Sequence, residues 1–451
     1  MLWLTCALPA TAVIREVGRG KTHASIQACH DAAAPRDICK IHPGTYTENV
    51  LVTKAIVFTA SGEEMPRIVG GFDVGSTSDV QLRGLEITTW GRFDAGSHGV
   101  QQLSGSNLTV ANCRIHDGYG AAVYSRNSTR LTVVGNEIYG ARIPQTKGVV
   151  TGDGMYILSA HSVDDTFATG THIERNVIHD NQEDGIKLQG EYFTVAANEI
   201  YNNIDTNWAT SHPDGIQVNS GTGDGYRSVR HAIFAGNKIR NHTQNLFVDG
   251  GREAWCADIR IYNNVLYNDA GVVNGVAMDV GAGGFATKNL AVSGCRDVWI
   301  YNNTFGRANS DSVRLSGNAA GSVHIKNNIF ANSLRHGLIV TDAGSIADGE
   351  LDYNLYFTPH GQNISFAGRW YASLGAFKSA VRTQEIHGRS GNPFLADWPK
   401  ALPLPGSPVI DNGITLPEPY QTDARGTARP QGSGWDIGAY EVIENKPSIG
   451  Q

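Results

Sequence analysis

Apolar and polar residues alternate in short runs along most of the chain, and many of these runs follow a turn. Three runs share one pattern, in which Asp-Gly precedes an apolar residue, a variable residue and a second apolar residue. They are Asp153-Gly154-Met155-Tyr156-Ile157, Asp184-Gly185-Ile186-Lys187-Leu188 and Asp214-Gly215-Ile216-Gln217-Val218. Each predicts a turn and a short strand whose variable residue faces outward. Their spacings of 31 and 30 residues place them at the same point on successive coils of a repeating structure.

A second run recurs in register with the first and is a short strand that closes on Asn. The closing residues are Asn112, Asn136, Asn176, Asn198, Asn237, Asn264, Asn303, Asn328 and Asn354. Stacked Asn side chains hydrogen-bond along a coil axis, so we expect a structural ladder. About eight residues later the next strand of the coil is expected to open. The residues at this place are Asp184, Asn245, Asp311 and His336, with Asn274 two residues further on.

The ends of the chain differ from the repeats. Ser25 precedes a short helical run that Pro35 ends, and a strand is expected at residues 38–41, so residues 15–60 predict an N-terminal cap and first coil. Residues 61–390 predict the coils, and the turn-rich residues 391–451 predict a C-terminal cap. The predicted fold is all-β: a parallel β-helix, or solenoid, with an N-terminal helical cap and a C-terminal wrap.

Composition agrees with many short strands and tight turns. Gly makes up 53 of 451 residues, and charged residues make up 18%. The net charge of −7 and the lack of a basic block argue against a nucleic-acid partner. No apolar run is long enough for a membrane span. Residues 1–14 are mostly apolar and include Ala10-Thr11-Ala12, which indicates either a remnant of an export signal or a first strand.

Two pairs of cysteines are placed for disulfides. Cys256 and Cys295 each lie eight residues before a ladder Asn, so they are expected to be neighbours on adjacent coils and to form a bond. Cys29 and Cys39 flank the turn between the N-terminal helix and the next strand, where a disulfide between them could close a small loop. Structural disulfides predict an oxidising compartment, so the protein is expected to be secreted or periplasmic.

The candidate chemistry centres on Lys187, the one cation among the three outward positions. Its coil has a short link before the Asp-Gly turn, whereas the neighbouring coils carry longer loops at residues 140–152 and 202–213. Two such loops on one side are expected to wall a groove with Lys187 on its floor. The first loop contains Arg142, and the second contains Trp208 and His212.

Taken together, the Asn ladder, the coil repeat and the C-terminal run Asp436-Ile437-Gly438-Ala439-Tyr440-Glu441 resemble the right-handed parallel β-helices of the pectate-lyase-like superfamily. Within it, the run from Asp184 to Gly190 is similar to the Lys-bearing run of family 9 pectate lyases. That resemblance implies Lys187 as the catalytic base and a Ca²⁺ ion held by nearby acids. The metal ligands so implied are Asp153, Glu183, Asp184 and Asp214.

The expected function is cleavage of an acidic, uronate-containing polysaccharide by β-elimination, by a monomeric extracellular enzyme. The candidate catalytic residues are Lys187, Asp184, Asp214 and His212. The candidate substrate-binding residues are Tyr156, Gln217, Trp208, Arg142 and Arg252. Three alternatives stay open: a glycoside hydrolase using paired Asp residues with His212 assisting, a uronate C5-epimerase, and a non-catalytic carbohydrate-binding β-helix. The acidic column also has a purely structural interpretation, because Asp before Gly suits a turn.

Overall fold

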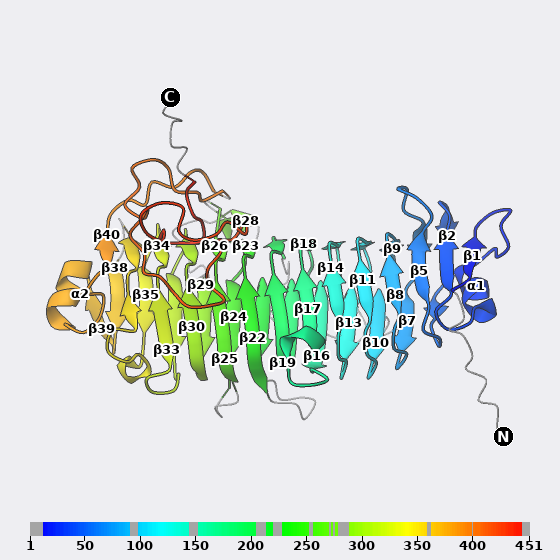
Figure 1. Cartoon of the computed structure of the whole chain (residues 1–451), viewed down its shortest axis with the longest axis horizontal. Coiled ribbons are helices and arrows are strands. Elements are labelled where there is room, and N and C mark those ends of the chain that lie inside the picture. The colour runs from blue at the N-terminus through cyan, green and yellow to red at the C-terminus, as the bar shows by residue number, and fades with distance from the viewer. Residues whose placement is uncertain are drawn as a thin grey trace, which may run out of the picture.

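The chain winds into an elongated solenoid of parallel strands, with a helix at each end (Figure 1). The computed structural model describes residues 12–90, 98–143, 152–203, 213–219, 228–251, 256–269, 272–273, 276–277, 288–358, 362–398 and 400–443. Each complete coil contributes one strand to each of three rows, and the strands of a row pair in parallel with those of the neighbouring coils. This arrangement confirms the predicted all-β parallel β-helix.

The first row carries the Asp-Gly runs. It contains β4 (Val50–Leu51), β7 (Phe72–Gly75), β10 (Val100–Leu103), β13 (Val123–Arg126), β16 (Met155–Ala160), the N-terminal part of β19 (Ile186–Ala196), β21 (Ile216–Asn219), β24 (Gln244–Asp249), β29 (Lys288–Ser293), β32 (Asp311–Ser316), β35 (His336–Val340) and β38 (Gln362–Phe366).

The second row follows directly along each coil. It contains β1 (Ile14–Val17), β2 (Ile38–Ile41), β5 (Val57–Ala60), β8 (Gln81–Arg83), β11 (Thr109–Ala111), β14 (Thr132–Val134), β17 (Thr171–Glu174), the C-terminal part of β19, β22 (Val229–Ala235), β25 (Cys256–Tyr262), β30 (Cys295–Tyr301), β33 (Val323–Lys326) and β36 (Leu351–Asp352).

The third row forms a separate sheet. It contains β3 (Thr45–Tyr46), β6 (Arg67–Val69), β9 (Glu86–Thr88), β12 (Arg114–His116), β15 (Glu137–Tyr139), β18 (Val177–His179), β20 (Glu199–Tyr201), β23 (Lys238–Arg240), β26 (Val265–Tyr267), β31 (Thr304–Gly306), β34 (Ile329–Ala331), β37 (Leu355–Phe357) and β40 (Arg389–Ser390). Outside the rows lie the antiparallel pair β27 (Val272–Val273) and β28 (Val276–Ala277), and the 3₁₀ turns η1 (Phe167–Thr169) and η2 (Ala343–Ser345).

The turn from the second to the third row explains the recurring Asn. Its first residue adopts positive φ and its second turns inward; in successive coils the first residues include Gly135, Arg175, Gly236 and Asn263. Positive φ suits Gly and Asn, which is why these types are frequent there. The inward residue is the ladder Asn. The prediction that Asn112 belongs to the ladder is wrong. Asn112 takes the positive-φ position of its turn, and Cys113 takes the inward position.

The ladder itself is continuous from Asn136 to Asn354. Each Nδ2 donates to the Oδ1 of the Asn on the next coil at 2.9–3.0 Å, and each Oδ1 also accepts the backbone N–H of the Asn before it. A second Nδ2 bond reaches a strand carbonyl, for example Asn198 to Ile173 at 2.9 Å. These amides are buried, so the ladder satisfies polar groups that would otherwise cost about 1–3 kcal/mol each.

Glu385 terminates the ladder. Its Oε1 accepts from Asn354 Nδ2 at 2.8 Å and from the Tyr356 hydroxyl at 2.6 Å, and the side chain is fully buried. Burial raises the pKa of this carboxyl to about 8, against the hydrogen bonds that favour the charged form. The folded state therefore holds a proton that the unfolded chain releases near the ordinary value of 4.5.

We expect the stability contributed by this group to be present below pH 4.5 and to be lost as the pH rises to about 8. Glu385→Gln keeps an acceptor for Asn354 and removes the ionisation, so its stability should decline less over that interval. Urea-unfolding midpoints at pH 5 and pH 8 measure the difference, with the exposed Glu64→Gln as the control that follows wild type. Equal declines in wild type and Glu385→Gln would contradict this assignment.

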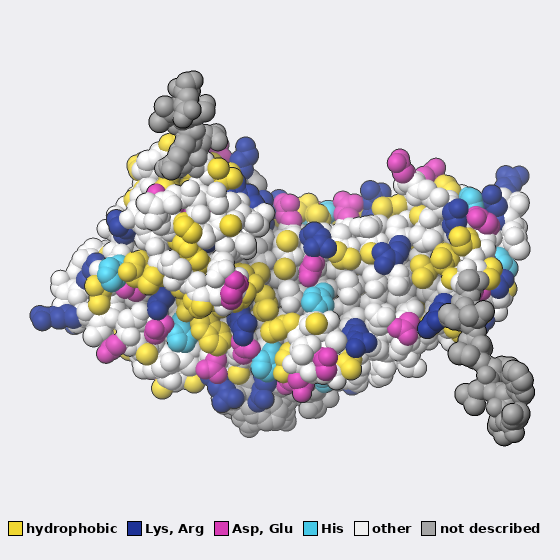
Figure 2. All heavy atoms as spheres, in the orientation of Figure 1, with side chains coloured by type: hydrophobic (Ala, Val, Ile, Leu, Met, Phe, Trp, Pro, Cys, Tyr) yellow, Lys and Arg dark blue, Asp and Glu magenta, His cyan; other side chains and the backbone are white. Residues whose placement is uncertain are grey.

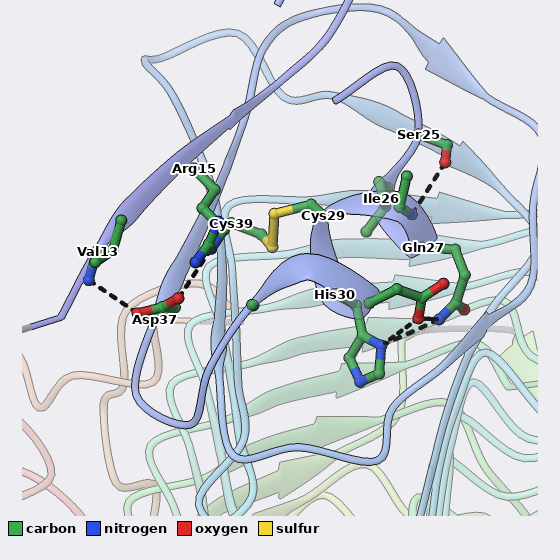
Figure 3. The surroundings of a disulfide bond; sticks show 12 residues. Val13, Arg15, Ser25, Ile26, Gln27, Cys29, His30, Asp37 and Cys39 are labelled. Atoms are coloured by element: carbon green, nitrogen blue, oxygen red, sulfur yellow. Dashed lines mark hydrogen bonds and ion pairs between the residues drawn. A yellow bond between two sulfur atoms is a disulfide. The ribbon is translucent and has the colours of Figure 1, made fainter. Parts of the chain in front are cut away.

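The N-terminal end is closed by α1 (Ile26–Ala32), which lies across the first coil (Figure 3). The Ser25 side chain caps α1 by accepting from the Ala28 N–H at 3.1 Å. A disulfide joins Cys29 of α1 to Cys39 of β2. The Asp37 carboxylate accepts from Val13 N–H and Arg15 Nε, both at 2.9 Å. Helix, disulfide and carboxylate together cover the open end of the core.

The other end is closed by β39 (Arg369–Tyr371), antiparallel to β38, and by α2 (Leu374–Ala380). Residues 391–443, within the predicted cap, lie along the side of the solenoid over third-row strands (Figure 1). Val409 and Ile437 pack on Ile329, and Asn263 Nδ2 donates to the Thr422 carbonyl at 2.7 Å. The segment thus covers a lateral face, while α2 covers the end.

The predicted bond between Cys256 and Cys295 is confirmed. These residues are register partners on β25 and β30, with Cα atoms 4.5 Å apart. The helices in the described part of the chain have seven residues each and are too short to span a bilayer. On the face seen in Figure 2, acidic and basic side chains are interspersed, with no block of one sign.

Candidate active site

The outward residues of the first row form a straight column along the solenoid. Strand register aligns Tyr124, Tyr156, Lys187, Gln217 and Phe247 on consecutive coils. Alternation along each strand turns these residues outward while their neighbours, such as Ile186, enter the core. Three of the predicted site residues, Tyr156, Lys187 and Gln217, are therefore side by side.

The three Asp residues of the Asp-Gly runs stack beside this column. Asp153 Oδ1 accepts the Asp184 N–H at 3.0 Å, and Asp184 Oδ1 accepts the Asp214 N–H at 2.8 Å. Asp214 Oδ1 in turn accepts the Gln244 N–H at 3.1 Å. All three carboxylates are almost fully buried. Each one thus satisfies a backbone donor on the next coil, which is the structural role that a turn Asp can take.

Later coils continue this column with other residues. Register places Gln244, Lys288, Asp311 and His336 in it. The prediction that Asn245 lies in this column is wrong. Asn245 aligns with Gly215 and turns inward, where its Nδ2 donates to Asn289 Oδ1 at 2.9 Å. Asn274 lies outside the described residues, and the first-row strand of that coil begins at Lys288.

Lys187 lies between a carboxylate and an aromatic ring. Its Nζ is 3.7 Å from Asp184 Oδ2 and 5.6 Å from the centre of the Tyr156 ring, and the side chain is 29% exposed. Burial lowers the pKa of the amine, but the charges of Asp184 and Asp153, with smaller contributions from Tyr156 and Glu183, outweigh it. The net pKa is raised above its ordinary value. Lys187 therefore carries its proton in the free protein at neutral pH.

Gln217 is bound on the opposite side of Lys187. Its Nε2 donates to Asp214 Oδ2 at 3.3 Å, and its Oε1 accepts from Asn219 Nδ2 at 3.4 Å. Tyr124 extends the surface in the other direction, with its ring 5.7 Å from that of Tyr156. Sequence reasoning missed Tyr124 and Asn219. The strand of Tyr124 follows Ala121-Ala122 in place of Asp-Gly, and only its alternating pattern marks it.

The predicted groove loops leave the solenoid at equivalent corners. Ala141, Asn181 and Asn203 occupy one position there, because Ala141 N–H donates to Asn181 Oδ1 and Asn181 N–H to Asn203 Oδ1, both at 3.1 Å. The coil of Lys187 passes directly from Asn181 to Asp184, whereas the coils on either side make their longer excursions from this corner. Residues 144–151 and 204–212 lie outside the described residues, and with them Trp208 and His212; so does Arg252.

Two other predicted residues lie at this corner. Arg142 is exposed, and its Nη1 donates to the Asp180 carbonyl at 3.0 Å. Glu183 donates its backbone N–H to the Gly152 carbonyl at 3.2 Å, and its negative charge contributes to the raised pKa of Lys187. The structure thus brings Asp153, Glu183 and Asp184 around Lys187, and leaves Arg142 in the turn.

The carboxylates expected to hold Ca²⁺ have other partners in the structure. Asp153, Asp184 and Asp214 each commit one oxygen to a backbone N–H, and the second oxygen of Asp184 faces Lys187. Within the described residues no three or more His, Cys, Asp or Glu side chains are grouped to hold a metal ion. The Ca²⁺ site implied by the resemblance therefore stays a prediction, which the assay with chelator below tests.

Comparison with known proteins agrees with this architecture. Residues 68–224 match the family model of the right handed beta helix region. The chain is a right-handed parallel β-helix. No curated protein matches it.

Solved structures give more distant likenesses. The pectate lyase Pel9A is 16% identical, with 96% of this chain and 97% of that chain covered and a TM-score of 0.46. The A-module of the Azotobacter vinelandii mannuronan C-5 epimerase AlgE6 is 14% identical over 82% and 94%, with a TM-score of 0.46. An alginate lyase from Paenibacillus sp. str. FPU-7 is 14% identical over 70% and 98%, with a TM-score of 0.39. Likenesses this distant assign no activity to the chain.

The charge around Lys187 is open to a direct test. Asp184→Asn keeps an oxygen that accepts the Asp214 N–H and removes one negative charge beside the amine, so we expect the pKa of Lys187 to fall. NMR titration of the ¹³C-methylated lysines measures it, with Lys187→Arg identifying the resonance. Asp214→Asn, a matched change one coil away, should lower the pKa less. An unchanged pKa in Asp184→Asn would show that this ion pair is absent in solution.

Proposed function

We propose that this protein is an exported enzyme that cleaves an acidic, uronate-containing polysaccharide by β-elimination. The proposed site is the outer face of β16, β19 and β21, with Lys187 at its centre. The observation that carries this proposal is the partly exposed Lys187 ammonium, which stands between the neutral residues Tyr156 and Gln217 and beside the buried carboxylate of Asp184. The two disulfides support the exported state, and we expect a monomer.

Binding of an acidic sugar follows from the residues of the column. The ammonium of Lys187, the prevalent form in the free protein, attracts an acidic polymer to this face, whereas the neutral form is the one assigned as the base. The Tyr156 ring beside it offers an apolar surface with a polar edge, as sugars require. Gln217 presents an amide that Asp214 and Asn219 hold in place. A cation, an aromatic ring and an oriented amide thus lie in line along consecutive coils.

β-Elimination makes three demands: the uronate carboxylate must be neutralised, a base must take the C5 proton, and the leaving oxygen must receive a proton. We assign the base to Lys187. Because neighbouring carboxylates raise its pKa, only a small fraction of the amine is neutral at neutral pH. That fraction grows about tenfold for each pH unit until the pKa is reached. The proposed role therefore requires a rate that climbs with pH.

The contacts of the acidic column weigh against the hydrolase alternative. A glycosidase needs two carboxyl groups that flank the scissile bond. Asp153, Asp184 and Asp214 are almost fully buried, and each is engaged by a backbone N–H. Epimerisation shares the abstraction of the C5 proton and differs in the face that is reprotonated. It is therefore an outcome that the same experiment separates.

The test is near-UV absorbance of the unsaturated product on polygalacturonate, alginate and other uronate polymers. Lys187→Ala should lower the rate of product formation by at least about a hundredfold, because removing a general base typically costs 10²–10⁴ in rate. Lys238→Ala, a lysine on the third row, is the matched control and should retain full activity. For wild type, kcat/KM should rise about tenfold per pH unit between pH 7 and pH 9.

Each other outcome has a distinct meaning. New reducing ends without absorbance would replace elimination by hydrolysis. Exchange of the C5 proton with solvent, without cleavage, would indicate an epimerase. Activity that depends on Lys187 but stays level from pH 7 to pH 9 would make Lys187 a carboxylate-binding cation and assign the base to another residue. The same assays with added Ca²⁺ and with chelator test the metal expectation.

A further inference from the structure

A second group of charged residues lies on the same face, towards the C-terminal end of the solenoid. It consists of Lys288, Asp311 and His336, which are register partners in the column that begins with Asp153, together with Arg314 and Trp370. Arg314 stands in the outward column of Lys187. None of these residues takes part in the site proposed above.

Asp311 is the centre of this group. It is fully buried; its Oδ1 lies 2.6 Å from His336 Nδ1, and its Oδ2 accepts from Arg314 Nη2 at 2.9 Å and Nε at 3.2 Å. Two nitrogens bonding to one oxygen fix the orientation of the guanidinium. Arg314 remains 42% exposed, so part of its side chain is accessible to a ligand. The arginine is oriented in advance for a ligand.

The group carries more positive than negative charge. Burial lowers the pKa of Lys288, and the neighbouring Arg314 lowers it further, against weaker contributions from Asp311 and Asp214. Lys288 has no ion-pair partner among the residues that the structure describes. Two cationic side chains, Lys288 and Arg314, thus lie close enough for the charge of Arg314 to disfavour that of Lys288. Such an excess is relieved by an anion, which a carboxylate-bearing sugar supplies.

Trp370 adds an apolar surface to the group. It lies on β39, beside Ser365 of β38, and its ring is tilted by 31° against that of His336, at a centroid distance of 4.3 Å. Half of its surface is exposed, which is high for a tryptophan. An exposed aromatic ring held against a neighbouring side chain is the pattern of a binding position.

The spacing connects this group with Lys187. The outward column runs from Lys187 through Gln217, Phe247 and Ala291 to Arg314. Four steps between parallel strands at ~4.8 Å give a separation of roughly 19 Å. The three intervening residues are neutral. A polysaccharide lying along the solenoid can therefore reach both cations without passing a charged side chain of this column.

We propose that Lys288, Arg314, His336 and Trp370 form a distal binding position for the same acidic polysaccharide. It takes the carboxylate of a uronate several sugar residues away from Lys187, with the sugar ring against Trp370. This inference rests on the proposed function for the identity of the polymer. It adds a dependence on chain length, because only an oligosaccharide long enough to reach both places gains the second contact.

Binding of uronate oligosaccharides of increasing length to the full chain tests this position. Isothermal titration calorimetry compares wild type, Lys187→Ala, Arg314→Ala and Trp370→Ala with octamers and dimers, at low temperature so that cleavage is slow. We expect Arg314→Ala and Trp370→Ala each to weaken octamer binding about tenfold and to leave dimer binding unchanged. Arg296→Ala, an exposed arginine on β30, is the matched control and should bind both lengths as wild type does.

The outcomes separate this inference from the proposed function. If octamers bind Arg314→Ala and Trp370→Ala as tightly as wild type while Lys187→Ala weakens them, the distal position is refuted and the site at Lys187 stands. If dimers and octamers lose affinity equally, the group is not a distal position but the primary sugar site. If wild type binds no uronate oligosaccharide of any length, both proposals fail. Unfolding midpoints of the two variants show that each remains folded, and the surface residue Trp370 gives a reading should Arg314→Ala unfold.

Discussion

The buried Asn ladder is the interaction on which the rest of the structure depends. From Asn136 to Asn354, the coils turn from the second to the third strand through a residue of positive φ and an inward amide, and that amide bonds its neighbours in the ladder. The ladder fixes the register between coils, because a slip of one residue would leave two amides and two backbone groups without partners in the core. The alignment of outward side chains, such as Tyr156, Lys187 and Gln217, depends on that register.

On this scaffold the first row combines two columns with different tasks. The inner column of Asp153, Asp184 and Asp214 completes backbone hydrogen bonds between coils. The negative charges of Asp184 and Asp153 also raise the pKa of Lys187 and keep its amine protonated. Structure and chemistry are therefore coupled, because the same carboxylates that join the coils also set the protonation of the residue at the centre of the proposed site.

Periodicity made much of this architecture predictable. The coil repeat, the ladder from Asn136 onwards and the Cys256–Cys295 bond all follow from equivalent positions becoming neighbours. The predictions were wrong where two neighbouring positions of a coil have different structural roles. Asn112 and Asn245 each lie one place from the predicted position, and composition alone does not distinguish a positive-φ Asn from an inward one. The raised pKa of Lys187 was also beyond sequence reasoning, since it depends on Asp153 of another coil and on burial.

The lateral C-terminal segment makes the two halves of the solenoid unequal. The Asn residues of positive φ at 263 and 327 use their side chains to hold Thr422 and Ile414, across separations of 159 and 87 residues. Early coils pair only with close neighbours in the chain, so they can form while synthesis is still under way. The later coils acquire their outer covering only from residues 391–443, which follow them in the chain. Folding therefore finishes at these later coils, and chains that lose residues 391–443 would display bare apolar strands there.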